Sequence, residues 1–370
     1  MRDEYYMQFA LNLAASGKGQ TAPNPVVGAI IVNNGEIVGL GAHLKAGEAH
    51  AEVHAIQMAG PKAHGGTIYV TLEPCNHYGK TPPCTEAIIQ AGIKEVVIAS
   101  EDVNPLVKGT GIKRLQKAGI TVRSGILQDQ AEQLNRAFFH FIETGKPFIT
   151  LKQAVTLDGK TATKTGHSKW ITSELARKDV HHDRGLHDAV LVGINTILAD
   201  DAQLTNRNGR TEHQPIRIVL DTHLKMPLDR KVIQDGHSPT WILTGSEVSD
   251  SQMAQFVQPH VEIIKLNKKS IEIDEVLYLL GKKNITSLYV EGGQMVQTSF
   301  LKSGNINQLI TYVSPKIVGG SISYGMFSDL DILRMDEAYP LVFERIEQLG
   351  VDIKIVSKII KEAPKCLPEL

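Results

Sequence analysis

The sequence has little of several features that would mark a specialised class of protein. It contains only 3 cysteines in 370 residues, too few for a disulfide framework, which favours a reducing compartment such as the cytoplasm. No apolar run reaches the roughly 18 residues of a membrane-spanning helix, and the N-terminus lacks the basic region and apolar core of a signal peptide. Lysine and arginine number 39 against 40 acidic residues, so a formal net charge of -1 offers no broad positive field. We therefore expect a cytoplasmic protein with no nucleic-acid or membrane partner, which binds any anionic ligand through local groups.

The chain is long enough for two domains, and its 42% hydrophobic and 21% charged residues are ordinary for a protein with sizeable cores. A helical pattern over 131–143 ends at Gly145-Lys146-Pro147, which breaks regular structure. We expect one domain over 1–146, a second over 147–362, and a C-terminal tail over 363–370.

Strands and helices are expected to alternate in the first domain. Asn34-Gly35 between two apolar runs indicates a hairpin. Helical patterns are expected up to about Ser16 and over 51–59, 85–91, 112–118 and 131–143, and strands over 26–32, 37–40, 67–72, 96–99 and 121–123. This order predicts a three-layer α/β domain with a largely parallel sheet.

The second domain contains more apolar runs and less regular helical patterns. Strands are expected over 149–151, 189–192, 216–220, 241–243, 261–266, 288–290, 310–313 and 351–356, with helices such as 273–280 and 295–301 between them. We predict a second α/β domain built on a large mixed sheet.

Three residues with metal-binding side chains lie where these elements are expected to begin or end. His50 precedes a helix, Cys75 follows a strand, and Cys84 precedes the next helix. One imidazole and two thiolates suit tetrahedral zinc, and a set of three leaves the fourth position for water, as in catalytic zinc sites. We predict one zinc ion per chain, held by His50, Cys75 and Cys84.

Glu52 is the expected proton carrier of this site, because a carboxylate that is not a ligand can move the proton of a zinc-activated water. Residues two apart on a helix point to nearly opposite sides, so Glu52 can share the site only if His50 lies before regular helix geometry begins. The pattern H-x-E followed by P-C and a second cysteine is typical of zinc deaminases, although eight residues separate the cysteines here instead of two. The alternative is a closed structural site with His54 or His77 as the fourth ligand.

The chain resembles the family of bifunctional riboflavin-biosynthesis deaminase/reductases over nearly its full length. In the first domain the matching stretches are 21–28, 50–52 and 75–84, and in the second they are 151–160, 168–173, 191–196, 204–207, 220–222 and 289–293. The resemblance implies an N-terminal cytidine-deaminase-like domain, followed by a C-terminal domain with a mixed sheet like that of dihydrofolate reductase.

By this resemblance, the first domain removes the 2-amino group of 2,5-diamino-6-(5-phosphoribosylamino)pyrimidin-4-one. The implied substrate contacts are Asn24, His43, Lys80, Asp102 and Asn104. Residue chemistry supports Asn24, whose amide can pair with a pyrimidine edge, and Lys80, a point charge suited to phosphate. The alternative for Asn24, His43 and Asn104 is a residue of a surface loop.

The second domain, by the same resemblance, reduces the ribosyl group of the deaminated product to ribityl with NADPH, giving 5-amino-6-(5-phosphoribitylamino)uracil. The implied cofactor contacts are Ala154, Trp170, Thr196, Asp200, Thr222, Gly293, Gln294, Met295, Val296, Gln297, Thr298 and Ser299. The implied substrate contacts are Ser168, Arg184, Leu204, Arg207 and Glu291. Residue chemistry supports the glycine turn before the helix at 295, which could bind a pyrophosphate, and the two arginines as phosphate clamps.

The proton donor of the reductase step stays open at this point. Hydride transfer to C1′ requires that carbon as an open-chain imine or aldehyde, so a proton donor must lie nearby. Lys152 and Asp200 are both candidates, and Lys152 could equally serve as an ion-pair partner within the fold.

Two other functions fit part of the pattern. A nucleic-acid deaminase would explain the zinc ligands, but the charge balance and the glycine-rich second domain lack the basic or aromatic face that it needs. A binding module stabilised by zinc would leave Glu52 without a purpose. We expect an enzyme with a small phosphorylated pyrimidine as its substrate, assembled as a homo-oligomer, either a dimer or a tetramer.

Overall fold

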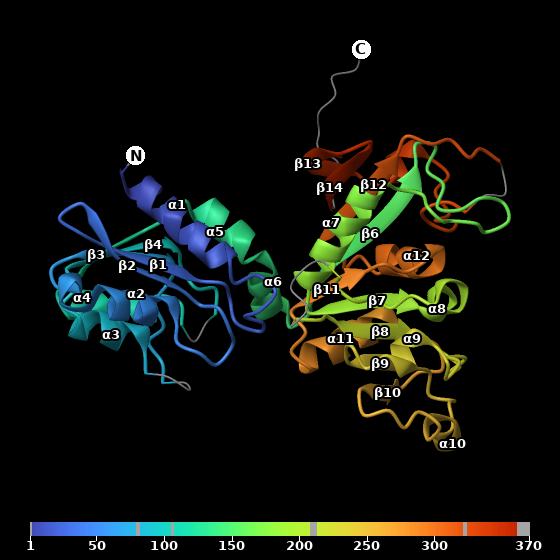
Figure 1. Ribbon diagram of the computed structural model, residues 1–370, viewed down its shortest axis with the longest axis horizontal. Coiled ribbons are helices and arrows are strands. Elements are labelled where there is room, and N and C mark those ends of the chain that lie inside the picture. The colour runs from blue at the N-terminus through green and yellow to red at the C-terminus, as the bar shows by residue number, and fades with distance from the viewer. Residues whose placement is uncertain (1, 79–81, 105–106, 208–212, 321–323, 361–370) are drawn as a thin grey trace, which may run out of the picture. The chain divides into compact units, whose positions relative to one another are not determined.

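The computed structural model describes residues 2–78, 82–104, 107–207, 213–320 and 324–360, and the chain forms two compact units, Met1–Lys146 and Pro147–Leu370 (Figure 1). The expected tail 363–370 lies outside the described residues. Within the described ranges, every helix is too short or too polar to cross a membrane.

Unit 1 is built on a five-stranded sheet in the order β2-β1-β3-β4-β5. Its elements are α1 (Arg2–Ala15), β1 (Gly28–Asn33), β2 (Glu36–Ala42), α2 (Ala51–Ala59), the 3-10 helix Gly60–Ala63, β3 (Thr67–Leu72), α3 (Cys84–Gln90), β4 (Glu95–Ser100), α4 (Thr110–Lys117), β5 (Thr121–Ser124), α5 (Gln128–Leu134) and α6 (Arg136–Thr144).

Helices cover both faces of this sheet, as the three-layer prediction requires. One core joins β1, β3 and β4 to α2, α3 and α4, and a second core on the other face joins the same strands to α1 and α5. The sheet is mixed, which corrects the prediction of a largely parallel one. β3, β4 and β5 run parallel, but β1 is antiparallel to both of its neighbours. The tight turn at Asn34-Gly35 reverses the chain between β1 and β2. Positive φ angles of 51° and 85° at these two residues match a hairpin turn that suits strand twist.

The helix expected over 131–143 is divided at Asn135. The side chain of Asn135 is buried, accepts a hydrogen bond from the backbone N–H of Val26 and donates one to the Val26 carbonyl, both at 2.9 Å. These bonds link the helix pair to the segment that leads into β1. The pattern of apolar residues cannot reveal such a break, because it depends on a partner 109 residues away.

Unit 2 contains a nine-stranded sheet in the order β10-β9-β8-β7-β11-β6-β12-β14-β13. Its elements are β6 (Phe148–Thr156), α7 (Glu174–Gly185), β7 (Ala189–Gly193), α8 (Ile194–Asp200), β8 (Ile216–Leu220), α9 (Lys231–Gln234), β9 (Thr240–Thr244), α10 (Asp250–Met253), β10 (Val261–Lys265), α11 (Ile273–Lys282), β11 (Ser287–Val290), α12 (Gln294–Lys302), β12 (Gln308–Ser314), the 3-10 helix Met335–Glu337, β13 (Leu341–Leu349) and β14 (Asp352–Ile359). The pairings from β10 to β12 are parallel and the last two are antiparallel, so the sheet is mixed as predicted.

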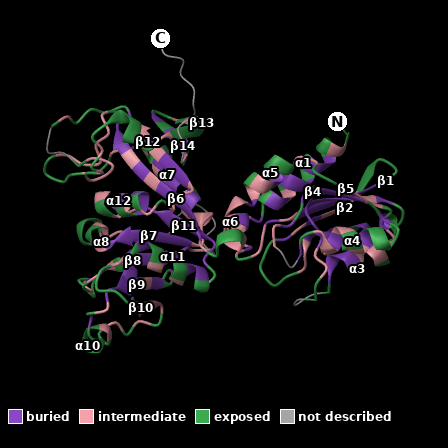
Figure 2. Ribbon diagram, turned by 180° about the vertical axis from the view of Figure 1, so that it is seen from behind, coloured by how far each residue is buried: buried purple, intermediate pink, exposed green. Residues whose placement is uncertain are grey.

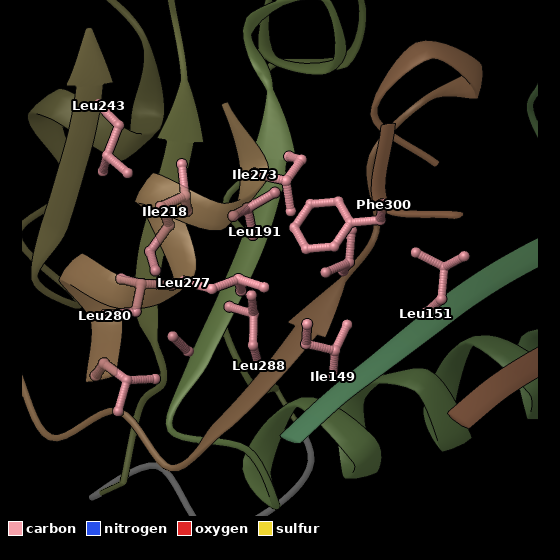
Figure 3. Close-up of a cluster of buried hydrophobic side chains, with 14 of the residues drawn as sticks. Ile149, Leu151, Leu191, Ile218, Leu243, Ile273, Leu277, Leu280, Leu288 and Phe300 are labelled. Carbon is pink, nitrogen blue, oxygen red and sulfur yellow. The ribbon is translucent and has the colours of Figure 1, made fainter. Parts of the chain in front are cut away.

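Buried strands of this sheet hold the core of unit 2. On one face, Leu191 of β7 and Leu288 of β11 pack with Leu277 of α11 and Phe300 of α12 (Figure 3). On the other face, α7, α8 and α9 cover the strands. Figure 2 shows the central strands as buried and the outward faces of the helices as exposed.

Several elements of unit 2 were not named in the sequence-based expectation, among them the strand β13 and the helix α7. The outermost strand β13 has mostly exposed residues, so it lacks the buried apolar face that marks a strand. α7 has the polar sequence ELARKDVHHDRG, but Asp183 within it is buried, and the side chain of Arg184 is only 11% exposed. Its apolar signal is weak because polar side chains occupy positions that face the core.

The carboxyl ends of parallel strands meet at one edge of each sheet. In unit 1, β3 leads into the turn with Cys75, and its parallel neighbour β4 leads into the loop with Asp102. In unit 2, β7 and β11 are neighbours and lead into α8 and α12. Crevices at such edges are where open α/β sheets bind their ligands.

Candidate active sites

His50, Cys75 and Cys84 come together in unit 1. Their potential ligand atoms lie within 4.8 Å of one another, and the His50 Nδ1 is 3.2 Å from the Cys84 Sγ and 3.6 Å from the Cys75 Sγ. Within the described ranges, this group is the only cluster of three such residues, so neither His54 nor His77 adds a fourth ligand there. Donors of this type and spacing fit a zinc ion with one open coordination position.

Local structure explains why these three side chains converge. His50 is the N-cap of α2, with φ -75° and ψ 163°, so it lies before regular helix geometry begins, as expected. Cys84 is the first residue of α3, and its backbone N–H donates to the Cys75 Sγ at 3.3 Å. Hydrogen bonds from Cys84 and His50 lower the pKa of the Cys75 thiol to about 4, in spite of its burial. Cys75 is thereby held as a thiolate, which is the form that binds a metal.

Glu52 lies on the first turn of α2, with 3% of its surface exposed. Burial, with a smaller contribution from the negative charge of Cys75, raises the pKa of its carboxyl to about 7. Glu52 also hydrogen-bonds Cys84, although it does not belong to the group of three ligands. It is therefore a buried carboxyl beside the ligands, as the sequence predicts for a proton carrier.

His43 and Asn24 form one wall of this site. The ring of His43 is buried and meets the ring of His50 edge-on, with the centroids 5.3 Å apart. The Ala49 carbonyl lies 3.2 Å from Nδ1 of His43, so Nδ1 donates to it and Nε2 accepts from the amide of Asn24, also at 3.2 Å. This arrangement orients both polar side chains, and burial lowers the pKa of His43, which favours the neutral ring.

The loop after β4 brings Asp102 to the same region. Asp102 is buried, and its carboxylate accepts a hydrogen bond from the Asn104 backbone N–H at 2.8 Å. Burial raises the pKa of Asp102, and the negative charges of Glu73 and Cys75 raise it further. The remaining expected contact, Lys80, lies outside the described residues.

Sequence reasoning missed Glu73. Its carboxylate is buried and accepts hydrogen bonds from backbone N–H groups of the loop after β4 and of α4. The only available signal was its position directly before Pro74-Cys75, which does not distinguish it from a surface carboxylate.

Glu291 is the centre of the second site. Its side chain is 8% exposed and accepts from Arg184 Nε at 2.5 Å and Nη2 at 3.0 Å, while Lys152 Nζ lies 3.4 Å away. Burial alone would raise the pKa of this carboxyl, but the charges of Arg184 and Lys152 lower it to about 2. Lys152 and Ala154 lie two residues apart on β6 and so share a face of the sheet.

The segment after α8 completes the cationic side of this site. Arg184 Nη1 donates to the Thr205 carbonyl at 3.2 Å, which places α7 against the stretch that carries Leu204 and Arg207. Leu204 is buried and Arg207 is exposed. Burial and, to a smaller extent, the positive charge of Arg184 lower the pKa of Arg207, so the two guanidinium groups repel each other. An anion between them would relieve their repulsion.

His181 belongs to this cluster and was not expected. Its Nδ1 is 3.1 Å from the Thr205 carbonyl, and burial together with Arg184 and Arg207 lowers its pKa to about 4. The spacing of three residues between His181 and Arg184 could have indicated a shared helix face, but only if α7 had been expected.

The glycine turn between β11 and α12 forms the expected cofactor side. A methyl group on Gly193 or on Gly292 would come within 2.8 Å of Val296, so both glycines permit the first turn of α12 to lie close to the end of β7. The same spacing puts Thr196 beside Gly293, with the Thr196 Oγ1 4.0 Å from an ideal Cβ there. Gly293 is the N-cap of α12 and has no side chain that could accept hydrogen bonds from the first N–H groups of this helix. Those N–H groups can therefore donate to a pyrophosphate.

Residues of α12 differ in what they can contact. Gln297 and Thr298 are buried and bond within the protein, Gln297 to the Lys152 and Gly292 carbonyls and Thr298 to the backbone of Gln294 and Ser328. Met295 is 72% exposed and Ser299 is also exposed, while Gln294 donates to the Phe327 carbonyl at 2.6 Å. The buried members shape the turn, and the exposed members are available for contact.

The remaining expected residues make other contacts in unit 2. Trp170 is 62% exposed and stacks on Arg177, with half-buried Ser168 two residues before it. The Asp200 carboxylate is 38% exposed and lies 3.2 Å from Lys169 Nζ. Thr222 follows β8, a strand two positions from β11 in the sheet.

Comparison with known families and proteins finds a match for each unit of the chain. The family "RibD C-terminal domain" matches residues 147–355, and the family "Cytidine and deoxycytidylate deaminase zinc-binding region" matches residues 1–100. The riboflavin biosynthesis protein RibD of Bacillus amyloliquefaciens is 49% identical over 355 residues, covering 96% of each chain. That of Escherichia coli is 42% identical, covering 95% of this chain and 98% of its own.

Solved structures extend the similarity to the whole fold. Acinetobacter baumannii RibD has a TM-score of 0.87 at 38% identity, over 97% of this chain and 99% of that one. The Thermotoga maritima diaminohydroxyphosphoribosylaminopyrimidine deaminase/5-amino-6-(5-phosphoribosylamino)uracil reductase has a TM-score of 0.85 at 35% identity, with the same coverage.

Proposed function

The chain belongs to the RibD family of bifunctional riboflavin-biosynthesis deaminase/reductases, and from this premise we propose which of its residues perform each reaction. The predicted combination of a cytidine-deaminase-like domain with a mixed-sheet reductase domain is confirmed, as is the use of zinc and NADPH. We assign deamination to residues 1–146 and reduction to residues 147–362, with 363–370 as a tail.

The deaminase assignment depends on one observation, the convergence of His50, Cys75 and Cys84 beside the buried carboxyl of Glu52. These three residues would hold the zinc ion, which would lower the pKa of a coordinated water toward neutrality. Glu52 accepts a proton from the attacking water and delivers it to the amino group that leaves as ammonia. Its carboxyl is suited to this because it hydrogen-bonds Cys84, is shielded from bulk water and does not belong to the ligand group.

Polar side chains around the cluster bind the diaminopyrimidine phosphate. Asn24 and His43 lie on the side of His50, and Asp102 and Asn104 come from the loop after β4. Lys80 is assigned to the phosphate. The orientation of His43 by the Ala49 carbonyl leaves Asn24 able to present its amide oxygen to the pyrimidine edge.

Replacement of Glu52 tests the deaminase assignment. Glu52→Gln keeps the shape of the side chain but cannot carry the proton, so we expect ammonia release to fall by about 10²- to 10⁴-fold. Metal analysis should still find one zinc per chain. Loss of zinc from this variant would identify Glu52 as a ligand and contradict the assignment.

For the reductase step, we assign the proton donor to Lys152. It lies on the β6 face shared with the expected cofactor contact Ala154, and its side chain is 16% exposed. Asp200 is more exposed and forms an ion pair with Lys169. When bound, NADPH would supply the hydride for C1′ of the open-chain imine, and Lys152 would supply the proton to the imine nitrogen, so that the ribosyl group becomes ribityl.

The remaining reductase residues bind the two ligands. Arg184 and Arg207 face the substrate phosphate, and Glu291 fixes Arg184 through two hydrogen bonds. Ser168 and Leu204 complete the substrate side. The turn and first part of α12 from Gly293 to Ser299 bind NADPH, with Ala154, Trp170, Thr196, Asp200 and Thr222.

Reduction of the purified deaminated intermediate tests the choice of donor. Lys152→Met should lower kcat by about 10²- to 10⁴-fold, the usual contribution of a general acid. Asp200→Asn should keep kcat and change at most the KM for NADPH. The reverse pattern would assign proton transfer to Asp200.

We also propose a homo-oligomer, a dimer or a tetramer, in the cytoplasm. The edge strand β13 and its neighbour β14 expose several apolar side chains, among them Phe343 at 60%, Ile346 at 59% and Val342 at 46%. A second copy that pairs with this edge would cover them. Sedimentation analysis of the full chain should show a dimer or larger species, and Phe343→Glu should shift it toward the monomer. A reducing cytoplasm keeps Cys75 and Cys84 free of disulfide bonds and so available as metal ligands.

A further inference from the structure

The buried carboxylate of Glu73 connects two parts of the deaminase site. One oxygen, Oε2, accepts from the backbone N–H groups of Asp102 at 3.4 Å and Gly109 at 2.9 Å. The other, Oε1, accepts from Gly111 at 3.0 Å and Ile112 at 3.3 Å. Four hydrogen bonds to one carboxylate, 4% exposed, are far more than a solvated surface residue makes.

These bonds replace the usual cap of a helix. α4 begins after Gly109, which has φ 71° and no side chain to accept from the first-turn N–H groups. Glu73 supplies the missing acceptor from the end of another element, and its negative charge lies where the helix dipole favours it. The start of α4 and the preceding loop are therefore positioned by Glu73.

The same carboxylate lies next to the metal-binding turn. Glu73 is followed by Pro74 and Cys75, and a methyl group on Gly111 would come within 2.1 Å of the Pro74 carbonyl oxygen. Asn76 adds a second link, because its side chain donates to the Thr110 carbonyl at 3.4 Å. The turn that carries Cys75 and the start of α4 are thus in direct contact.

We propose that Glu73 is a positioning residue of the deaminase, which fixes the loop of Asp102 and Asn104 relative to the zinc ligands and thereby determines substrate binding. This inference rests on the proposed substrate roles of Asp102 and Asn104. Glu73 itself contacts no substrate, since its oxygens face the backbone of the loop. Glu73 accepts a hydrogen bond from the backbone N–H of Asp102 and so fixes the position of this residue. Its effect on the substrate is indirect, through the position of the Asp102 carboxylate.

Glu73→Gln is the most direct perturbation. The amide keeps one accepting oxygen, but its NH2 group faces two N–H donors, so either the loop or the first turn of α4 loses its acceptor. We expect the KM of ammonia release for the diaminopyrimidine phosphate to rise by about 10- to 100-fold, as loss of a hydrogen bond to a charged group predicts. The kcat and the zinc content should stay close to those of the unchanged protein.

Hydrogen exchange and a control variant separate positioning from general stability. In Glu73→Gln the backbone N–H groups of 102, 109, 111 and 112 should exchange faster, while those in the second half of α4 stay protected. Glu95→Gln is the matched control, because it makes the same replacement at the opposite end of β4, where Glu95 bonds Arg123 and Thr67. It should leave the KM unchanged.

A double variant distinguishes failure of this inference from failure of the substrate assignment. If Asp102→Asn alone leaves the KM unchanged, the assignment of Asp102 is wrong and the inference falls with it. If Asp102→Asn raises the KM, the double variant Glu73→Gln with Asp102→Asn should be no worse than the poorer single variant, since both act through one carboxylate. Fully additive effects, or an unchanged KM in zinc-loaded Glu73→Gln, would overturn the inference.

Glu73→Asp carries the same test if the glutamine variant does not fold. It keeps the charge and both oxygens but is shorter by one methylene, so the loop must shift toward β3 to keep its bonds. A raised KM with normal kcat and zinc is expected. Loss of stability together with a normal KM would show that Glu73 only stabilises the fold, which would overturn the inference.

Discussion

Replacing Glu291 with glutamine would remove the negative charge between two cations of unit 2 that are largely shielded from solvent. The carboxylate bonds Arg184 through two N–H groups and lies 3.4 Å from Lys152 Nζ, and the three side chains are 8%, 11% and 16% exposed in that order. The glutamine amide keeps the shape of the side chain but removes the negative charge that balances the positive charges of Arg184 and Lys152.

The contribution of the Glu291 carboxylate to the free energy of unfolding follows from its pKa and from the cost of breaking a buried ion pair. A pKa lowered from its ordinary value of 4.5 to about 2 corresponds to about 3 kcal/mol of stability at neutral pH. Removing one partner of a buried ion pair costs about 3–5 kcal/mol, because the other charge stays buried. We therefore expect the free energy of unfolding of unit 2 to fall by about 3 kcal/mol in Glu291→Gln.

The sign of the pH dependence follows from the lowered pKa. The contribution of Glu291 is fully present above its unfolded value of 4.5 and is lost as the pH falls toward its folded value of about 2. The difference between the unchanged protein and Glu291→Gln should thus be largest at neutral pH and should shrink as the pH falls below 4.5.

Urea unfolding followed by tryptophan fluorescence measures this difference in unit 2 alone, because both tryptophans, Trp170 and Trp241, belong to it. Glu262→Gln serves as the control, since Glu262 pairs with Lys283 at the surface and should contribute about 0–1 kcal/mol. A loss below about 1 kcal/mol in Glu291→Gln, or a loss that does not change with pH, would refute a buried, charge-paired Glu291.

Three further predictions concern single side chains. Cys75→Ser should lower zinc content and deamination together while reduction of the deaminated intermediate continues, and full zinc occupancy would contradict its role as a ligand. Arg207→Ala should weaken binding of the reductase substrate by about 2–5 kcal/mol if Arg207 pairs with a phosphate that is buried in the complex, measured as Kd by calorimetry, and an unchanged Kd would show that Arg207 does not bind the phosphate. Asn135→Ala leaves the buried N–H and carbonyl of Val26 without partners, so the first unit should lose about 1–3 kcal/mol, measured by hydrogen exchange in β1, where unchanged protection would contradict the argument.

Elements with a strong local signal were predictable from sequence. The hairpin at Asn34-Gly35 and the central strands of unit 2 show apolar periodicity and turn residues that determine their structure locally. β13 and α7 were not, because an exposed edge strand and a helix with buried charges do not follow the rule of apolar inside and polar outside.

Some residues of the candidate sites were predictable from the sequence and others were not. The metal group was predictable because histidine and cysteine at element boundaries are rare and chemically specific, and its geometry places His50 at the N-cap of α2 as required. Glu73 and His181 were not, since a single carboxylate or imidazole acquires its role only from the backbone groups that surround it in the fold. Those partners come from segments that sequence patterns do not bring together.

The most direct test of the central account is NADPH oxidation by the zinc-loaded protein supplied with the diaminopyrimidine phosphate, with Glu52→Gln measured beside it. We expect the unchanged chain to oxidise NADPH after releasing ammonia, and the variant to oxidise NADPH only when the deaminated intermediate is supplied. Ammonia release without oxidation, or equal oxidation by the variant from the diamino substrate, would contradict two reactions performed in this order by one chain.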